Sequence, residues 1–131
     1  MPADDDARPE PRRRPSSVYG VGSEPDARFS LANERTALAW VRTGLGLVAG
    51  GVALTSFATF AELPVMLDVV AAVACLAGAG LALYSLRAWS RNEVALRTGL
   101  PLPAPSALPV LVVGVVVMGI LIAGYAVSTI L

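Results

Sequence analysis

Three long stretches without a charged residue constrain the fold of this chain more than any other feature. They cover residues 43–61, 69–86 and 98–131. An α-helix rises about 1.5 Å per residue, so about 20 residues cross the roughly 30 Å hydrocarbon core of a bilayer. Each stretch is therefore long enough for one membrane-spanning helix, the second one narrowly.

A soluble three-helix bundle is the alternative, and the residue pattern disfavours it. The chain has 131 residues, of which 55% are hydrophobic and only 15% charged. A helix that is apolar on all sides must be buried or surrounded by lipid. A chain of this length cannot bury three such helices. The sequence therefore predicts an all-α integral membrane protein with three transmembrane helices.

Residues that typically begin or end helices divide the chain into a tail and a membrane domain. Residues 1–27 are rich in proline and charge and predict a disordered cytoplasmic tail. Residues 28–131 form the expected three-helix membrane domain, with helices at about 30–61, 65–98 and 107–130. Ser30 is the expected N-cap of the first helix, Pro64 begins the second, and Gly99 ends it.

The distribution of arginine predicts the topology. Arginines occur before the first span and between the second and third, whereas the first loop holds only Glu62 and Asp68. By the positive-inside rule, the N-terminus lies in the cytoplasm and the C-terminus outside. Trp40 and Trp89 fall at the expected inner interface, where tryptophan is favoured. The expected location is the plasma (inner) membrane, as a multi-pass protein.

A row of arginines leads into the first span. Arg28, Arg35 and Arg42 are spaced by two helical turns and lie near one stripe of the helix. The same face continues into the membrane with Gly46 and Gly50, a small-x-x-x-small pattern that lets another backbone approach closely. Small residues also mark the other two spans. The expected helix-packing residues are Gly46, Gly50, Gly78 and Gly119. Such seams imply tight packing, within one subunit or between subunits of a homo-oligomer.

A second group of charges follows the second span. Arg87 and Arg91 are four residues apart, and Glu93 and Arg97 repeat that spacing and can pair. Glu34 is a candidate for an ion pair with Arg87 or Arg91 that would join the first two helices. The arginines have two open interpretations: they set topology and bind lipid headgroups, or they form an anion or phosphate site at the inner mouth. The candidate contacts are Arg28, Arg35, Arg42, Arg87 and Arg91.

The residues that enzymes and metal sites require are scarce. The chain has no histidine, and Cys75, its one cysteine, lies inside the second span without a companion ligand. No nucleophile has a base beside it, so we expect no catalytic residue, no metal, no cofactor and no enzymatic activity. The expected partners are the lipid bilayer, further copies of the chain, and anionic lipid or a phosphate polymer, but not nucleic acid.

Two segments resemble a known family. Leu31-Ala-Asn-Glu-Arg-Thr, followed by Leu38-Ala-Trp-Val-Arg-Thr43, is similar to the signature of the YidH-type inner-membrane family, also called domain of unknown function 202. Arg87-Ala-Trp-Ser-Arg-Asn-Glu-Val-Ala-Leu-Arg97 resembles the family's arginine-rich extension of the second helix. The resemblance covers about residues 28–131. Ala37 departs from it, because an aromatic residue is common there.

The same domain is similar to the membrane part of the vacuolar transporter chaperone, in which three-helix units surround a pore for polyphosphate. This resemblance implies that Arg28, Glu34 and Arg35 match charged positions at the inner mouth, and that Arg87 matches a basic position. Arg42 has no counterpart there. Two hypotheses follow: an oligomeric membrane subunit or scaffold without chemistry of its own, or an anion or polyphosphate conduit with an arginine-lined cytoplasmic mouth.

Overall fold

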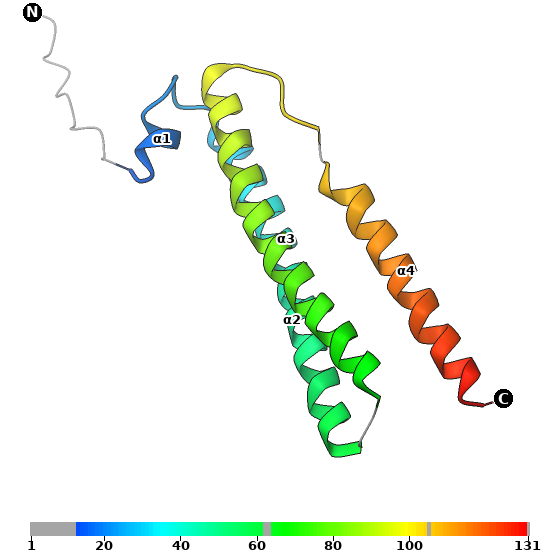
Figure 1. Cartoon of the computed structure of the whole chain (residues 1–131). Coiled ribbons are helices and arrows are strands. Elements are labelled where there is room, and N and C mark those ends of the chain that lie inside the picture. Colours follow the sequence, from blue (N-terminus) through cyan, green and yellow to red (C-terminus); the bar gives the residue numbers. More distant parts are fainter. Residues whose placement is uncertain (1–12, 62–63, 105, 131) are drawn as a thin grey trace, which may run out of the picture.

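The computed structural model describes residues 13–61, 64–104 and 106–130, and these residues form helices and connecting segments only. The helices are α1 (Ser16–Tyr19), α2 (Ala27–Ala61), α3 (Val65–Thr98) and α4 (Ala107–Ser128), as Figure 1 shows. Of the helices described, α2, α3 and α4 are long and apolar enough to cross a membrane. The prediction of an all-α chain with three membrane-spanning helices is confirmed.

Helices α2 and α3 form a long antiparallel hairpin (Figure 1). Four small or amide residues of α2 are buried along one face: Asn33, Gly44, Gly51 and Ala58. Gly44, Gly51 and Ala58 recur every seven residues, the period of two helices that keep contact along a common seam, and Asn33 precedes Gly44 by eleven residues, or three helical turns. At about 1.5 Å per residue, each helix is about 50 Å long, some 20 Å more than the hydrocarbon core. The excess lies at the end where α2 begins and α3 ends, because the uncharged stretches occupy the other end.

Glycine allows the two backbones to approach in the centre of the hairpin. A Cβ atom added to Gly44 would lie 2.6 Å from the carbonyl oxygen of Gly78. A Cβ added to Gly51 would lie 2.7 Å from the carbonyl oxygen of Ala71. Near the end of the span, the buried Ser85 hydroxyl donates to the carbonyl oxygen of Ala37 at 2.8 Å. Close van der Waals packing and interhelical hydrogen bonds are the interactions that hold helices together in lipid.

The first helix begins earlier than its expected cap. Helix α2 starts at Ala27, and the Asp26 carboxylate accepts a hydrogen bond from the Arg28 backbone N–H at 2.9 Å. Asp26 is therefore the N-cap, and Ser30 was the wrong choice. The other predicted boundaries agree more closely. Pro64 precedes α3, Gly99 ends it with φ of 67°, and α4 ends at Ser128.

Residues 13–26 form a segment that we call the N-terminal strap. It contains α1 and lies against the end of α3, with Val18 fully buried. The expected tail of residues 1–27 therefore differs from the structure at residues 13–27, which have defined positions, while residues 1–12 lie outside the described part. Because this segment is rich in proline and charge, its composition predicted disorder and gave no sign of the few side chains that anchor it.

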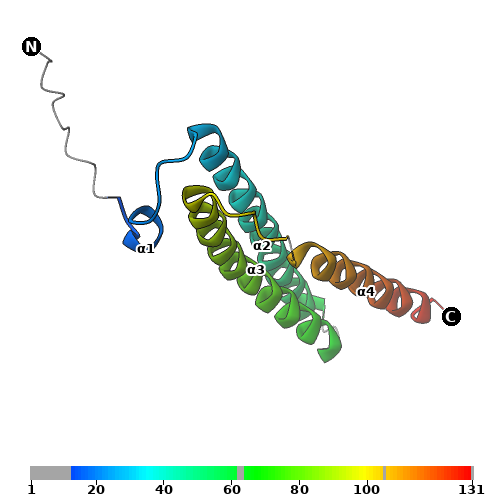
Figure 2. The same ribbon diagram turned by 90° about the horizontal axis from the view of Figure 1, so that it is seen from above.

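Helix α4 runs back alongside α3 and separates from the hairpin on the side away from α1 (Figures 1 and 2). None of its residues is buried. One polar contact, 3.3 Å between the Tyr84 hydroxyl and the Ser106 hydroxyl, joins the start of α4 to α3. The described chain begins at the α2–α3 end that carries the arginines, and α4 ends at the opposite end (Figure 1).

Two glycines of α3 provide a matched test of the hairpin seam. We expect Gly78→Ala to destabilise the protein by about 1–3 kcal/mol, because the new Cβ would lie 2.8 Å from Val48 Cγ2 and even closer to the Gly44 carbonyl. Gly80→Ala should be neutral or stabilising, since a Cβ there meets nothing within 4 Å. Reversible unfolding in detergent, followed by circular dichroism, measures both. Equal effects would contradict the assigned seam.

Candidate functional site

The arginine row of α2 lies on the side of the helix opposite α3. Arg28, Arg35 and Arg42 are all exposed, and none of the ion pairs among the described residues includes them. Because α2 starts at Ala27, Arg28 belongs to the helix and shares the stripe. Gly46 and Gly50 continue on this outer side, where an added Cβ meets nothing within 4 Å. The predicted row therefore faces away from the single chain.

The predicted packing glycines divide into two classes. Gly78 lies in the contact between α2 and α3, whereas Gly46, Gly50 and Gly119 have open space at the Cβ position. Within the single chain, the α2 side of the contact with α3 is formed by Gly44 and Gly51 and not by Gly46 and Gly50. The latter two remain candidates for contacts between subunits.

Arg87 and Arg91 form a separate basic group on α3. Both are exposed and line a shallow pocket with Tyr84, Ser90 and Ser106. None of the arginines of the α2 row lines that pocket. The structure of the single chain thus places the five candidate arginines on two surfaces instead of one.

Glu93 is the carboxylate that joins α2 and α3. The sequence had predicted this role for Glu34. Glu34 is exposed, and no ion pair within the described residues includes it. Glu93 is 2% exposed and accepts hydrogen bonds from the Ser30 hydroxyl at 2.8 Å and the Asn33 side-chain amide at 3.3 Å. The Asn33 amide also donates to the Trp89 carbonyl oxygen at 3.1 Å.

We call Ser30, Asn33, Asn92, Glu93 and Arg97 the polar cluster. Asn92 donates to the Asn33 side-chain oxygen at 3.2 Å, and Arg97 Nε lies 3.6 Å from Glu93 Oε1. The predicted pairing of Glu93 with Arg97 is confirmed. The sequence did not predict Ser30 and Asn33 as partners of Glu93. One signal was present, because Asn33 precedes Trp40 by seven residues and so lies on the same inner face of α2. A buried carboxylate needs such donors, because an unpaired charge is costly away from water.

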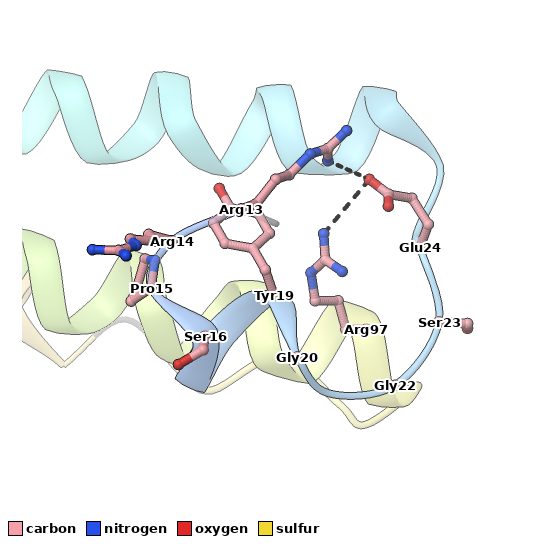
Figure 3. A pocket seen from close by; sticks show the side chains of 10 residues that line it. All are labelled: Arg13, Arg14, Pro15, Ser16, Tyr19, Gly20, Gly22, Ser23, Glu24 and Arg97. Carbon is pink, nitrogen blue, oxygen red and sulfur yellow. Dashed lines mark hydrogen bonds and ion pairs between the residues drawn. The ribbon is translucent and has the colours of Figure 1, made fainter. Parts of the chain in front are cut away.

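Arg97 belongs to the polar cluster and also contacts the N-terminal strap, and Figure 3 shows it beside Tyr19 and Glu24. Its guanidinium lies over the Tyr19 ring, 4.7 Å from Cζ to the ring centroid, and Nη2 is 3.6 Å from the Glu24 carboxylate. Arg13 approaches the same Glu24 oxygen at 2.6 Å. The Arg97 carbonyl oxygen accepts from the Ser23 N–H at 3.0 Å. Gly22, with φ of 63°, passes so close to this carbonyl that a Cβ would overlap it.

These contacts form a clamp that holds α2, α3 and the N-terminal strap together. Glu93 and Arg97 are buried against each other, and Arg97 Nε has no hydrogen-bond partner. Among the described residues, no three His, Cys, Asp or Glu side chains lie together as metal ligands would. Cys75 faces α2, where its thiol lies 3.8 Å from the Val48 carbonyl oxygen. The exposed arginines of the two surfaces are able to bind an anion from solution.

Comparisons with known proteins agree with this architecture. A family model described as "Domain of unknown function (DUF202)" matches residues 28–131. Inner membrane protein YidH of Escherichia coli (strain K12) is 45% identical over 110 residues, which cover 80% of this chain and 96% of the relative. An uncharacterised protein of Mycobacterium tuberculosis is 42% identical over 100 residues, covering 74% of this chain and 80% of the relative. No solved structure matches the chain.

Two glutamates allow a direct test of which carboxylate joins the helices. Glu93→Ala should cost about 3–5 kcal/mol in the free energy of unfolding, because it removes the buried carboxylate beside Arg97 and leaves only the exposed Glu24 among its described carboxylate partners. Glu34→Ala, at an exposed position, should change stability by no more than about 0.5 kcal/mol. Chemical denaturation in detergent measures both values. A larger loss for the Glu34 variant would refute the assignment.

Proposed function

The chain belongs to the DUF202 family of membrane proteins, and from this premise we propose that it is an oligomeric subunit of the plasma (inner) membrane that acts through assembly. YidH, the similar Escherichia coli protein, is named an inner membrane protein. The proposed cytoplasmic side is the end that carries the arginines, in keeping with the positive-inside rule. The C-terminus would then lie outside.

The observation that carries this proposal is the outer face of α2. Gly46, Ala49, Gly50 and Ala53 are all exposed on it and form a shallow strip along the span. Small residues allow a second helix to approach closely, and close packing is the main source of helix association in lipid. The α2–α3 contact does not use this strip, so it is available for another copy of the chain.

A second candidate is an anion conduit, and the arginine row supports it. Arg28, Arg35 and Arg42 lie on the same outer face as the glycine strip. Copies that assembled through this strip would bring their arginines together near the cytoplasmic mouth, where clustered positive charge attracts phosphate-bearing ions. The conduit thus depends on the same assembly, whereas the scaffold does not need a pore.

Assembly can be tested by enlarging the strip. We expect the wild-type chain to be oligomeric in lipid nanodiscs and Gly46→Leu/Gly50→Leu to be monomeric, because two leucines would hold the partner backbone away. Ala79→Leu, at an exposed position of α3, should leave the oligomer intact. Native mass spectrometry reads the mass of each. A wild-type chain that stays monomeric at all protein-to-lipid ratios would overturn the proposal.

Conduction separates the two candidates. In planar bilayers with chloride, phosphate or short polyphosphate, a conduit should carry anion current that Arg35→Ala abolishes. Arg14 is also exposed but lies outside α2, so Arg14→Ala should leave that current unchanged. A verified oligomer that carries no current would exclude the conduit and leave the scaffold.

A further inference from the structure

The face of α3 that turns towards α4 bears an apolar groove. Its upper part has a volume of about 770 Å³ and is lined by Ala74, Ala77 and Leu81 of α3 and by Val110, Leu111 and Gly114 of α4. The groove exists because α4 stands away from the hairpin and because alanine and glycine leave room between the helices. An apolar groove at this depth is in contact with the lipid phase.

A polar pocket adjoins the groove at the end that carries Arg87 and Arg91. Tyr84 and Ser106 line both the groove and the pocket that contains Arg87, Ser90 and Arg91. The hydroxyl groups of Tyr84 and Ser106 are 3.3 Å apart and mark the boundary between the two compartments. Apolar lining thus gives way to hydroxyls and two guanidinium groups within one continuous surface.

The upper part of the groove, between Tyr84 and Val73, is about as long as one leaflet. Val73, at its far end, precedes Tyr84 by about eleven residues, or about 16 Å along the helix. Half of a roughly 30 Å hydrocarbon core is about 15 Å. An acyl chain that enters at Tyr84 would therefore reach the middle of the bilayer at Val73.

Charge distinguishes the two ends of the groove. Beyond Val73 it continues into a second cavity of about 750 Å³ between α3 and α4, and no arginine lines that cavity. Arg87 and Arg91 are exposed, and within the described residues neither makes an ion pair. Arginine presents a planar fork of donors that suits phosphate oxygens. A phospholipid fits both ends of this arrangement, because its phosphate matches the guanidinium groups and its acyl chain matches the apolar lining.

We propose that the α3–α4 groove binds an anionic phospholipid, with its headgroup phosphate at Arg87 and Arg91 and an acyl chain between Ala77 and Gly114. The hydroxyl groups of Tyr84, Ser90 and Ser106 complete the headgroup site. This site lies on α3 and α4, apart from the glycine strip of α2, so it does not depend on the oligomer.

The headgroup half is tested by lipid retention. The full chain is reconstituted in nanodiscs that contain equal amounts of phosphatidylglycerol and phosphatidylcholine, released into the gas phase, and its retained lipids are counted by native mass spectrometry. We expect the wild type to retain phosphatidylglycerol over phosphatidylcholine by at least about tenfold, and Arg87→Gln/Arg91→Gln to lose this preference. Arg13→Gln/Arg14→Gln removes the same charge from two exposed positions of the N-terminal strap and should keep the preference.

The acyl-chain half is tested by filling the groove. Ala77→Trp should abolish retention of phosphatidylglycerol, while Ala79→Trp, on the same turn but outside the groove, should not. Equal retention of both lipids by the wild type would overturn the proposal. So would full displacement of the lipid by millimolar glycerophosphate, which would identify a free phosphate site. An Ala77→Trp variant that keeps its lipid but loses its oligomeric state would show that a second copy occupies the groove.

Discussion

The close approach of the α2 and α3 backbones at Gly44 and Gly78 is the contact on which the rest of the structure depends. Lipid tails are as apolar as the side chains of a neighbouring helix, so the hydrophobic effect does not bring these helices together. Their association needs surfaces that fit at short range, and a Cβ atom on either glycine would overlap the backbone of the opposite helix. This contact keeps the hairpin in register and brings Ser30 and Asn33 opposite Glu93.

The polar cluster follows from that register and from the length of the hairpin. Because α2 and α3 are longer than the hydrocarbon core, their common end extends beyond it and can hold a buried carboxylate with its donors. Arg97 then anchors the N-terminal strap through Tyr19 and Glu24. The arginines of α2 point away from this clamp. The protein therefore separates an internally paired group of charges from the exposed arginines, which remain available to lipid, ions or other copies.

Sequence reasoning found the helices better than it found their faces. The uncharged stretches, Pro64 and Gly99 predicted the ends of α3 correctly, because lipid excludes charge and because few residues adopt positive φ. The sequence predicted a packing seam at Gly46 and Gly50 and left open whether it lies within one subunit or between subunits, while the intrachain seam runs through Gly44 and Gly51. Both pairs are glycines in one helix, and a helix apolar on all sides carries no stripe that tells which face meets a partner.

The sequence by itself determined that the chain is an α-helical membrane protein with arginine concentrated towards one end, since hydropathy and charge act on each segment independently. Only the tertiary structure decided that Glu93 and not Glu34 joins the first two helices, because that choice depends on the rotation of α3 about its axis. It also decided that residues 13–26 form a strap and that α4 leaves a groove beside α3. These features arise from contacts between segments far apart in sequence, where a few well-placed side chains outweigh local composition.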